Sequence, residues 1–242
     1  MGFGDDIMAT ADAVALYRKN PVKVAIGKNK RFYWSPVFEN NPILATPREV
    51  RGGNVQWLEH ASGCRPYIDY EKTTPERWAF KKIGPLKPGY LDIERQSGEY
   101  VFIEPHIKAK ASPNKQWGQW QGLVDITPVD FVQPDYGKPI LDGVRSIPTR
   151  DFIDACRLLS GARAYVGPEG GLHHASAALG VPAVVIFGGF VSPEVTGYRA
   201  HRNLFKGEAC GMRVRCSHCR EIMASITPED VRAELYELLE ET

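Results

Sequence analysis

The segment 164–189 constrains the fold of this chain more than any other part of the sequence. An apolar run at 164–167 predicts a buried strand, a glycine-rich turn follows it, and small residues at 171–179 predict a helix. Gly180 stands where a helix C-cap is expected, and a second apolar strand is predicted at 182–187. A strand, a turn, a helix and a strand in this order are typical of a βαβ unit in a parallel sheet.

The glycine turn of this segment is a predicted anion-binding site. Gly170 and Gly171 allow a ligand to approach the backbone, and the free N–H groups and dipole of the following helix favour negative charge. In an open α/β sheet such a turn lies at the carboxyl edge of the strands, where ligands bind. The pattern favours phosphate binding over the alternative that these glycines serve backbone shape alone.

The rest of the C-terminal part continues the same alternation. A strand at 100–104 and helices at 116–124 and 149–160 precede the opening segment. This order of elements is typical of repeated βαβ units. We therefore predict a Rossmann-like domain over residues 96–242.

The last helix of the chain has a clear start signal. Thr227 is the expected N-cap, Pro228 the first helical residue, and Asp230 completes a capping box. The stripe expected to be buried on this helix consists of Val231, Leu235 and Leu238.

The N-terminal part is less regular. Helical spacing of apolar residues predicts a helix over about 5–19, and a short apolar strand follows at 22–27. Residues 28–95 are rich in proline and aromatic side chains, which indicates an irregular but folded α/β region. We predict that residues 1–95 form a second, reduced domain.

Composition argues against several classes of function. A net charge of +1 over 242 residues gives no overall field that attracts nucleic acid or an anionic membrane. No apolar run approaches the roughly 18 residues of a membrane-spanning helix. Five cysteines, an odd number, indicate a reducing compartment, and acidic residues near the start argue against a signal peptide. We therefore expect a cytoplasmic protein.

Three cysteines near the end of the chain raise the question of a metal site. Cys210, Cys216 and Cys219 have the spacing C-x5-C-x2-C, with His201 and His218 close in sequence. Structural zinc sites take four Cys or His ligands, and this spacing does not identify the fourth. The sequence alone therefore favours packed thiols over zinc, and we assign no metal to the site.

Four segments carry motifs in a fixed order along the chain. Residues 2–10 read Gly-Phe-Gly-Asp-Asp followed by a helical pattern, and 100–117 hold a strand, a loop and Lys-Gln-Trp. Residues 169–179 read Glu-Gly-Gly-Leu-His-His and a run of small residues, and 219–231 end in Ile-Thr-Pro-Glu-Asp-Val. Together they resemble the lipopolysaccharide heptosyltransferase-like glycosyltransferases of family 9. That resemblance implies two Rossmann-like halves in a reduced GT-B arrangement, without the family's first strand.

The resemblance also implies an activity and a set of site residues. It implies an inverting, metal-independent glycosyltransferase that moves a sugar from a nucleotide-diphosphate donor to a hydroxyl acceptor, with no other cofactor. Asp5 corresponds to the catalytic base, although an aspartate at this position is also a common helix cap. The residues that the resemblance assigns to donor binding are Lys115, Arg150, Glu169, Gly170, Gly171, Leu172 and His174.

Two departures from the family pattern leave the sugar unidentified. Glu169 stands where the family has aspartate, and Gly170 replaces a residue with a hydroxyl group. These changes also keep open a non-catalytic relative that only binds a nucleotide sugar. The pattern Gly-x-Gly-x-x-Gly is missing, which disfavours a dinucleotide-dependent oxidoreductase.

The sequence leaves two alternatives for the acceptor of the sugar. A glycan acceptor follows from the resemblance. Lysines at 108, 110 and 115 lie close to Trp117 and Trp120, and basic and aromatic residues together are typical of surfaces that bind single-stranded nucleic acid. A phage-type enzyme that glycosylates a hydroxymethylated DNA base is therefore an alternative, although core tryptophans beside a donor-binding lysine are favoured.

Overall fold

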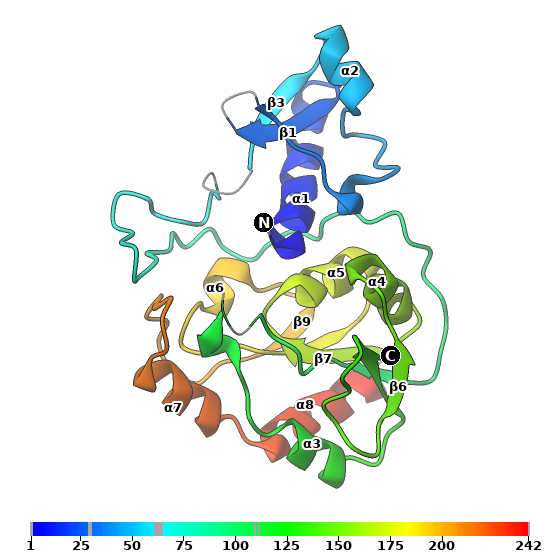
Figure 1. Ribbon diagram of the computed structural model, residues 1–242, viewed down its shortest axis with the longest axis vertical. Helices are drawn as coiled ribbons and strands as arrows, with labels where there is room; N and C mark the ends of the chain where they lie inside the picture. Colours follow the sequence, from blue (N-terminus) through cyan, green and yellow to red (C-terminus); the bar gives the residue numbers. More distant parts are fainter. Residues whose placement is uncertain (1, 29–30, 61–64, 109, 111, 242) are drawn as a thin grey trace.

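The computed structural model describes residues 2–28, 31–60, 65–108, 110 and 112–241. The chain forms two α/β parts, and the N-terminus lies where these parts meet (Figure 1). The C-terminal part contains a six-stranded parallel sheet, and the N-terminal part contains a three-stranded sheet.

The strands of the C-terminal sheet have the order β6-β5-β4-β7-β8-β9. Their bounds are Val101–Ile103 (β4), Phe131–Asp135 (β5), Arg145–Pro148 (β6), Ala164–Pro168 (β7), Ala183–Ile186 (β8) and His201–Leu204 (β9). The chain builds outward from β4 in one direction and from β7 in the other. This is the strand order of a Rossmann fold, and its topological switch point lies between β4 and β7.

Helices cover both faces of this sheet (Figure 1). Their bounds are Trp120–Ile126 (α3), Phe152–Ser160 (α4), Gly171–Leu179 (α5), Pro193–Thr196 (α6), Ser217–Ser225 (α7) and Pro228–Glu240 (α8). Strand residues point alternately to the two faces, so Val166 packs with α3 and α8 whereas Tyr165 packs with α4 and α5. Burial on both faces explains why the central strands β4, β7 and β8 are largely apolar.

The N-terminal part has a smaller sheet with the order β2-β1-β3, in which β3 is parallel to β1 and β2 is antiparallel to it. Its elements are Phe3–Lys19 (α1), Val24–Lys28 (β1), Arg31–Phe32 (β2), Pro36–Phe38 (η1), Pro47–Gly52 (α2) and Gln56–Glu59 (β3). Residues 65–100 contain isolated bridges but no helix and no ladder strand. The irregular region predicted from the prolines is thus confirmed.

One apolar core joins the two parts of the chain. Ile7 and Met8 of α1 belong to the same buried cluster as Leu172 and Ala175 of α5, and α1 packs directly on α5. The first helix is therefore held against the helix that begins at the glycine turn. The division of the chain near residue 95 remains a prediction.

Several predicted elements are confirmed. Helix α5 has the predicted bounds, and Gly180 ends it with φ of 66°, which a glycine adopts without steric cost. The closing helix α8 begins with the predicted capping box of Thr227 and Asp230. In the part of the chain that the structure describes, no helix is both long and apolar enough to cross a bilayer.

Other predictions of secondary structure were wrong. The helix expected at 116–124 begins only at Trp120, as α3. Residues Pro113–Lys115 form a 3-10 turn (η2), and Gln116 after it is extended. The helix expected at 149–160 starts only at Phe152, since Asp151 is its N-cap. Strands β5, β6 and β9 were missed. They are short, and their polar residues and prolines obscure the strand pattern.

The closing helix packs within the C-terminal part of the chain. Helix α8 lies on α3 and on β7, β8 and β9 of the C-terminal sheet. Its apolar stripe of Val231, Leu235 and Leu238 completes the core on that face.

Candidate functional site

The candidate site lies at the carboxyl edge of the sheet, at its topological switch point. Glu104 follows β4, and Glu169 follows the neighbouring strand β7. Both carboxylates are buried, with exposed fractions of 5% and 6%. Two buried carboxylates at adjacent strand ends need compensating polar partners. Glu104 and Glu169 each have their own group of such partners.

The turn after β7 leaves room for a ligand at its backbone. A side chain added at Gly170 would meet only the carbonyl oxygen of Pro168, at 3.9 Å. The following helix α5 presents its free N–H groups at this turn, with the positive end of its dipole. The backbone at Gly170 is thus open to a ligand, and the assignment of this turn to phosphate binding remains a prediction.

Glu169 is the centre of a buried polar cluster. The Lys115 ammonium donates to Oε2 of Glu169, and Nε2 of His174 lies 3.5 Å from Oε1. The other ring nitrogen of His174 is 2.9 Å from the Tyr198 hydroxyl. Sequence analysis placed Lys115, Glu169 and His174 at one site, and the structure brings these three side chains into contact.

The charge of Glu169 is maintained by these partners. Burial alone raises the pKa of Glu169, but the Lys115 ammonium and His174 outweigh burial and hold that pKa well below its usual range. The carboxylate is thus ionised at neutral pH and neutralises Lys115. A bound diphosphate would offer Lys115 a second anionic partner at the same place.

The two histidines of the motif have different surroundings. His173 is fully buried against Phe187 and Tyr198, and neither of its ring nitrogens has a polar partner among the described residues. Burial keeps the pKa of His173 well below its usual range. His173 is therefore a core residue, whereas His174 faces the carboxylate.

The start of α1 meets the start of α5 at this turn. A side chain at Gly4 would approach Cδ2 of His174 to 2.5 Å and the Cα atom of Gly171 to 3.3 Å. Phe3 stacks on Phe152 of α4, with ring centroids 4.6 Å apart. The Gly-Phe-Gly-Asp motif and the glycine-turn motif, separated by most of the chain, thus lie in contact.

Asp5, the candidate base, is held by two residues that the sequence analysis did not identify. The Tyr67 hydroxyl donates to Oδ1 of Asp5, and the Arg65 guanidinium lies 2.7 Å from Oδ2. Burial and the nearby Asp5 carboxylate raise the pKa of Tyr67 well above its usual range, so this hydroxyl keeps its proton. Both partners come from the irregular segment, where no pattern signals a function.

Asp6 is not an exposed first-turn charge. Its Oδ2 accepts hydrogen bonds from the Ser35 hydroxyl at 2.7 Å and from the Tyr33 hydroxyl at 3.1 Å. Burial raises the pKa of Asp6 despite these two hydrogen bonds. Asp6 therefore ties α1 to the chain after β2 and plays a structural part.

Two further predicted residues lie outside the Glu169 cluster. Arg150 is exposed and binds Asp154 at 2.6 Å, one helical turn further along the chain. Leu172 is 7% exposed and packs in the core. The structure thus brings neither side chain to Lys115 and Glu169, and their assignment to donor binding remains a prediction.

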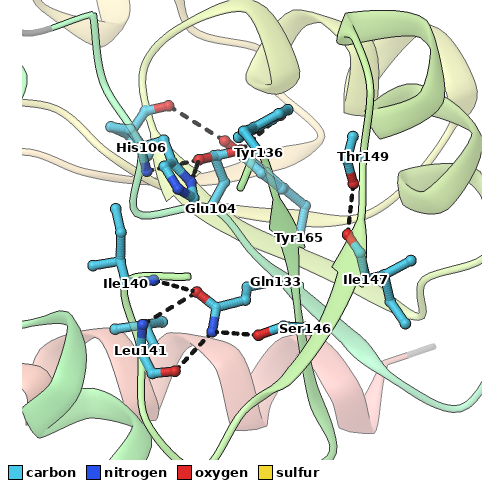
Figure 2. A network of polar contacts seen from close by, with 11 residues as sticks. Glu104, His106, Gln133, Tyr136, Ile140, Leu141, Ser146, Ile147, Thr149 and Tyr165 are labelled. Atoms are coloured by element: carbon cyan, nitrogen blue, oxygen red, sulfur yellow. Dashed lines mark hydrogen bonds and ion pairs between the residues drawn. The ribbon is translucent and has the colours of Figure 1, made fainter. Parts of the chain in front are cut away.

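A second polar network surrounds Glu104 on the other side of the switch point (Figure 2). Its Oε1 accepts from the backbone N–H of His106 at 2.6 Å and lies 2.7 Å from Nδ1 of the same ring. The Tyr136 hydroxyl is 3.4 Å from Oε2. Burial alone lowers the pKa of His106, but Glu104 and the backbone of Lys138 outweigh burial and raise that pKa. Sequence analysis missed this network, although Glu104 ends a predicted strand.

The tryptophans near Lys115 are core residues. Trp117 is 1% exposed and its indole N–H donates to the carbonyl oxygen of Ile226 at 2.8 Å, and Trp120 is 6% exposed. Stacking on nucleic-acid bases needs exposed aromatic rings. The interpretation of this loop as a nucleic-acid surface therefore loses its aromatic component, and the preferred interpretation of core tryptophans is confirmed.

A groove of 810 Å³ lies between residues 72–82 of the N-terminal part and residues 192–211 of the C-terminal part. Trp78 lines it and packs on Phe190, with ring centroids 5.8 Å apart. The ammonium of Lys115 lies 5.4 Å from the centroid of the same Phe190 ring. The Phe190 ring is thus a neighbour both of Trp78, which lines the groove, and of Lys115.

Comparisons with known proteins identify the fold. No protein-family model and no curated protein sequence matches the chain. A solved glycosyl transferase of family 9 from Veillonella parvula matches 100% of this chain and 96% of its own, with a TM-score of 0.61 and 14% identity. The iron-containing heptosyltransferase TibC, solved with ADP-D-beta-D-heptose, matches 64% of this chain with a TM-score of 0.51 and 20% identity.

The extent of these matches defines what is shared. The chain spans about half the length of TibC, of which it covers 49%, but nearly the whole of the Veillonella protein. Identities of this size establish a common fold. This chain therefore has the GT-B type fold of the family 9 glycosyltransferases, as its motifs predicted.

Proposed function

We propose that this protein is an inverting glycosyltransferase that uses a nucleotide-diphosphate sugar as donor. One observation carries the proposal: the start of α1, with Asp5, meets the start of α5, with Gly171, beside the Lys115–Glu169 pair. A site for anions and a carboxylate from a different part of the chain thus converge at the switch point of a GT-B fold. Sugar transfer from a diphosphate needs both groups.

The departing diphosphate gains negative charge in the transition state, so fixed positive charge at this position lowers the barrier. The free N–H groups of the Gly170–Gly171 turn and the Lys115 ammonium supply that charge in our proposal. Because an ammonium and backbone dipoles fill this role, the proposed reaction assigns no step to a metal ion. Glu169 keeps Lys115 in place before the donor arrives, and His174 supports Glu169.

Asp5 is the proposed general base. Each carboxylate oxygen has two lone pairs, so Asp5 can accept from an acceptor hydroxyl while Arg65 and Tyr67 hold its orientation. Proton removal by Asp5 as the acceptor attacks, with the diphosphate leaving on the opposite face of the sugar, gives inversion at the anomeric carbon. Arg65 and Tyr67 are positioning residues in this scheme.

The nucleoside of the donor and the acceptor are assigned to two places near the proposed reaction centre. We place the nucleoside near Glu104 and His106, at the carboxyl end of β4 beside the topological switch point. We place the acceptor in the groove beside Trp78, which both parts of the chain line. The acceptor proposed is a glycan hydroxyl, because the buried tryptophans do not support a DNA surface. The ADP-heptose bound by TibC makes that sugar the first donor to test.

The state of the cysteine side chains agrees with a reducing compartment. The four described cysteines are unpaired thiols, which fits a reducing compartment. We therefore propose that transfer takes place in the cytoplasm.

The decisive experiment is a panel of ADP-, UDP-, GDP- and dTDP-sugars tested for thermal stabilisation and for sugar transfer or hydrolysis. A true donor at 100 times its dissociation constant adds about 2.7 kcal/mol to the free energy of unfolding. Asp5→Asn should keep this stabilisation and lower turnover by about 100-fold or more. Asp12→Asn, on the same helix but paired with His60, is the matched control and should retain turnover.

The outcomes separate the proposal from its alternatives. Donor binding with full turnover in Asp5→Asn would remove Asp5 as the base. Donor binding without turnover in the unmodified protein, for every acceptor class including hydroxymethylated DNA, would favour the non-catalytic alternative. If no nucleotide sugar stabilises the protein, the proposed function is wrong.

A further inference from the structure

A cluster of thiols and one imidazole lies outside the proposed transfer site. Cys210 precedes an extended loop, Cys216 is the N-cap of α7, and His218 and Cys219 lie in the first turn of that helix. Their Sγ and ring nitrogen atoms all lie within 4.8 Å of one another. The structure thus supplies, in His218, the fourth ligand that the sequence spacing left unidentified.

The distances between the four ligand atoms are short enough for one tetrahedrally coordinated ion to bind all of them. With Zn–S bonds of about 2.3 Å and a Zn–N bond of about 2.0 Å, the ligand atoms of a tetrahedral site lie roughly 3.5 to 3.8 Å apart. The Sγ atoms of Cys210 and Cys219 are 3.2 Å apart, too far for a disulfide bond and close to that range. Cys219 is fully buried, while His218 is exposed, so an ion can enter from the His218 side.

The backbone around the cluster is built for close approach. A side chain at Gly189 would lie 3.1 Å from Nδ1 of His218 and 3.0 Å from the Cα atom of Cys219. The N–H of Cys210 donates to the carbonyl oxygen of Gly189 at 2.7 Å. A Cβ at this position would press on both residues, so glycine favours the close approach of the loop after β8 to the start of α7.

The charged residues near the cluster also suit a cation bound by several thiolates. Three thiolates, one neutral imidazole and a divalent cation carry a net charge of −1. Within four positions of a cluster residue along the chain, Lys206, Arg213, Arg215 and Arg220 exceed Glu208 and Glu221 by two positive charges, which offsets the excess. Soft thiolates with one imidazole in tetrahedral geometry are a ligand set that zinc prefers.

We propose that Cys210, Cys216, His218 and Cys219 form a structural zinc site. The site is closed, since four protein ligands leave no position for water or substrate. In this proposal the ion takes no part in the bonds made and broken during sugar transfer, and its role is to fix the loop between Cys210 and α7.

That loop in turn holds the segment that carries Lys115. The side-chain amide of Asn114 donates to the carbonyl oxygens of Met212 at 2.6 Å and Val214 at 2.7 Å, and it accepts from the N–H of Cys216 at 3.0 Å. Asn114 therefore forms hydrogen bonds with three backbone groups of the loop that the proposed ion would close. Loss of the ion should loosen residues 112–119 as well as the loop.

Metal analysis of the purified full-length protein tests the proposal directly. We expect one zinc ion per chain after purification without chelators, and less than a tenth of that in Cys216→Ser and Cys219→Ser. His218→Ala changes only an exposed ligand and should fold normally, yet weaken zinc binding by roughly 10-fold or more. Cys156→Ala removes a buried thiol of α4, away from the cluster, and should keep the full zinc content.

Two further measurements do not depend on activity. Cobalt substitution should give the thiolate charge-transfer and visible bands of a tetrahedral ion. Removal of zinc by a chelator should lower the melting temperature and speed amide exchange in residues 112–119, with β1 as the unaffected reference. Zinc content unchanged by all three ligand substitutions would overturn the proposal. So would a metal-free unmodified protein, or iron in place of zinc with the same dependence on the ligands.

Discussion

The two helix starts that meet at the site are built in opposite ways. The start of α5 follows a buried strand of a regular sheet, and a local glycine pattern forms its turn. The start of α1 lacks a side-chain cap, and its Asp5 is held by Arg65 and Tyr67, some 60 residues away in an irregular segment. The anion-binding side is therefore determined locally, and the side with the proposed base depends on long-range contacts.

This difference suggests different sensitivity to substitution. The α5 side concentrates buried charge in the pair of Lys115 and Glu169, so removing one partner leaves an uncompensated ion. The α1 side holds the Asp5 carboxylate with two partners, Arg65 and Tyr67, so that one partner remains when the other is removed. Substitutions on the first side should thus cost more than those on the second.

Lys115→Met should have the largest effect. It leaves the buried Glu169 carboxylate without its cation, and we expect the free energy of unfolding to fall by about 3 to 5 kcal/mol, with loss of donor binding. The double variant Lys115→Met with Glu169→Gln should regain most of the stability but not the binding. Denaturant unfolding and donor titration measure both, and Lys108→Met, on an exposed lysine, is the control. Equal stability of the single variant and the unmodified protein would contradict the importance of the pair.

Acid should be the next largest perturbation of the α5 side. Burial lowers the pKa of His201 to about 4 from 6.5. Between these values the unfolded chain binds more protons, so stability falls as the pH drops from 6.5 to 4, by about 3 kcal/mol from this residue. His201→Phe should flatten the pH dependence measured by thermal unfolding, whereas the exposed control Tyr236→Phe should leave it unchanged. An identical slope in His201→Phe would show that His201 is not buried in its neutral form.

Gly4→Ala tests the contact between the two helix starts. The added Cβ would lie 2.5 Å from Cδ2 of His174, and we expect a cost of about 2 kcal/mol from forced repacking, together with weaker donor binding. Gly52→Ala, in α2 with open space around the added atom, should be neutral or slightly stabilising. If both variants have the same stability, the two helix starts do not pack as described.

Tyr67→Phe should have the smallest effect on stability. It removes one hydrogen bond to the Asp5 carboxylate, worth about 1.5 kcal/mol for a charged acceptor, while the Arg65 contact remains. We expect unchanged donor affinity, lower turnover and a shifted pH profile for turnover, because Tyr67 positions the proposed base. Tyr70→Phe, at an exposed tyrosine of the same segment, is the control. Unchanged turnover and pH profile would assign Tyr67 to packing alone.

Much of the C-terminal framework could be predicted from local pattern. The bounds of α5, the cap at Gly180 and the capping box at Thr227 depend on residues close in sequence, and the structure confirms them. The motifs also predicted that Lys115, Glu169 and His174 lie close together, and in the structure Glu169 contacts both Lys115 and His174. Strands β5, β6 and β9 were missed because short strands depend on their neighbours for hydrogen bonds, so their own residues give a weak signal.

The amino-acid sequence by itself determined the local geometry of this protein: where the glycine turn lies, which helix follows it and which strands are buried. Backbone preference and apolar spacing act over a few residues, so a single segment suffices to specify them. Only the tertiary structure decided which distant groups meet: Arg65 and Tyr67 at Asp5, Gly4 at His174, and His218 beside three cysteines. Such contacts depend on the free energy of the whole packed chain, and no local pattern records them.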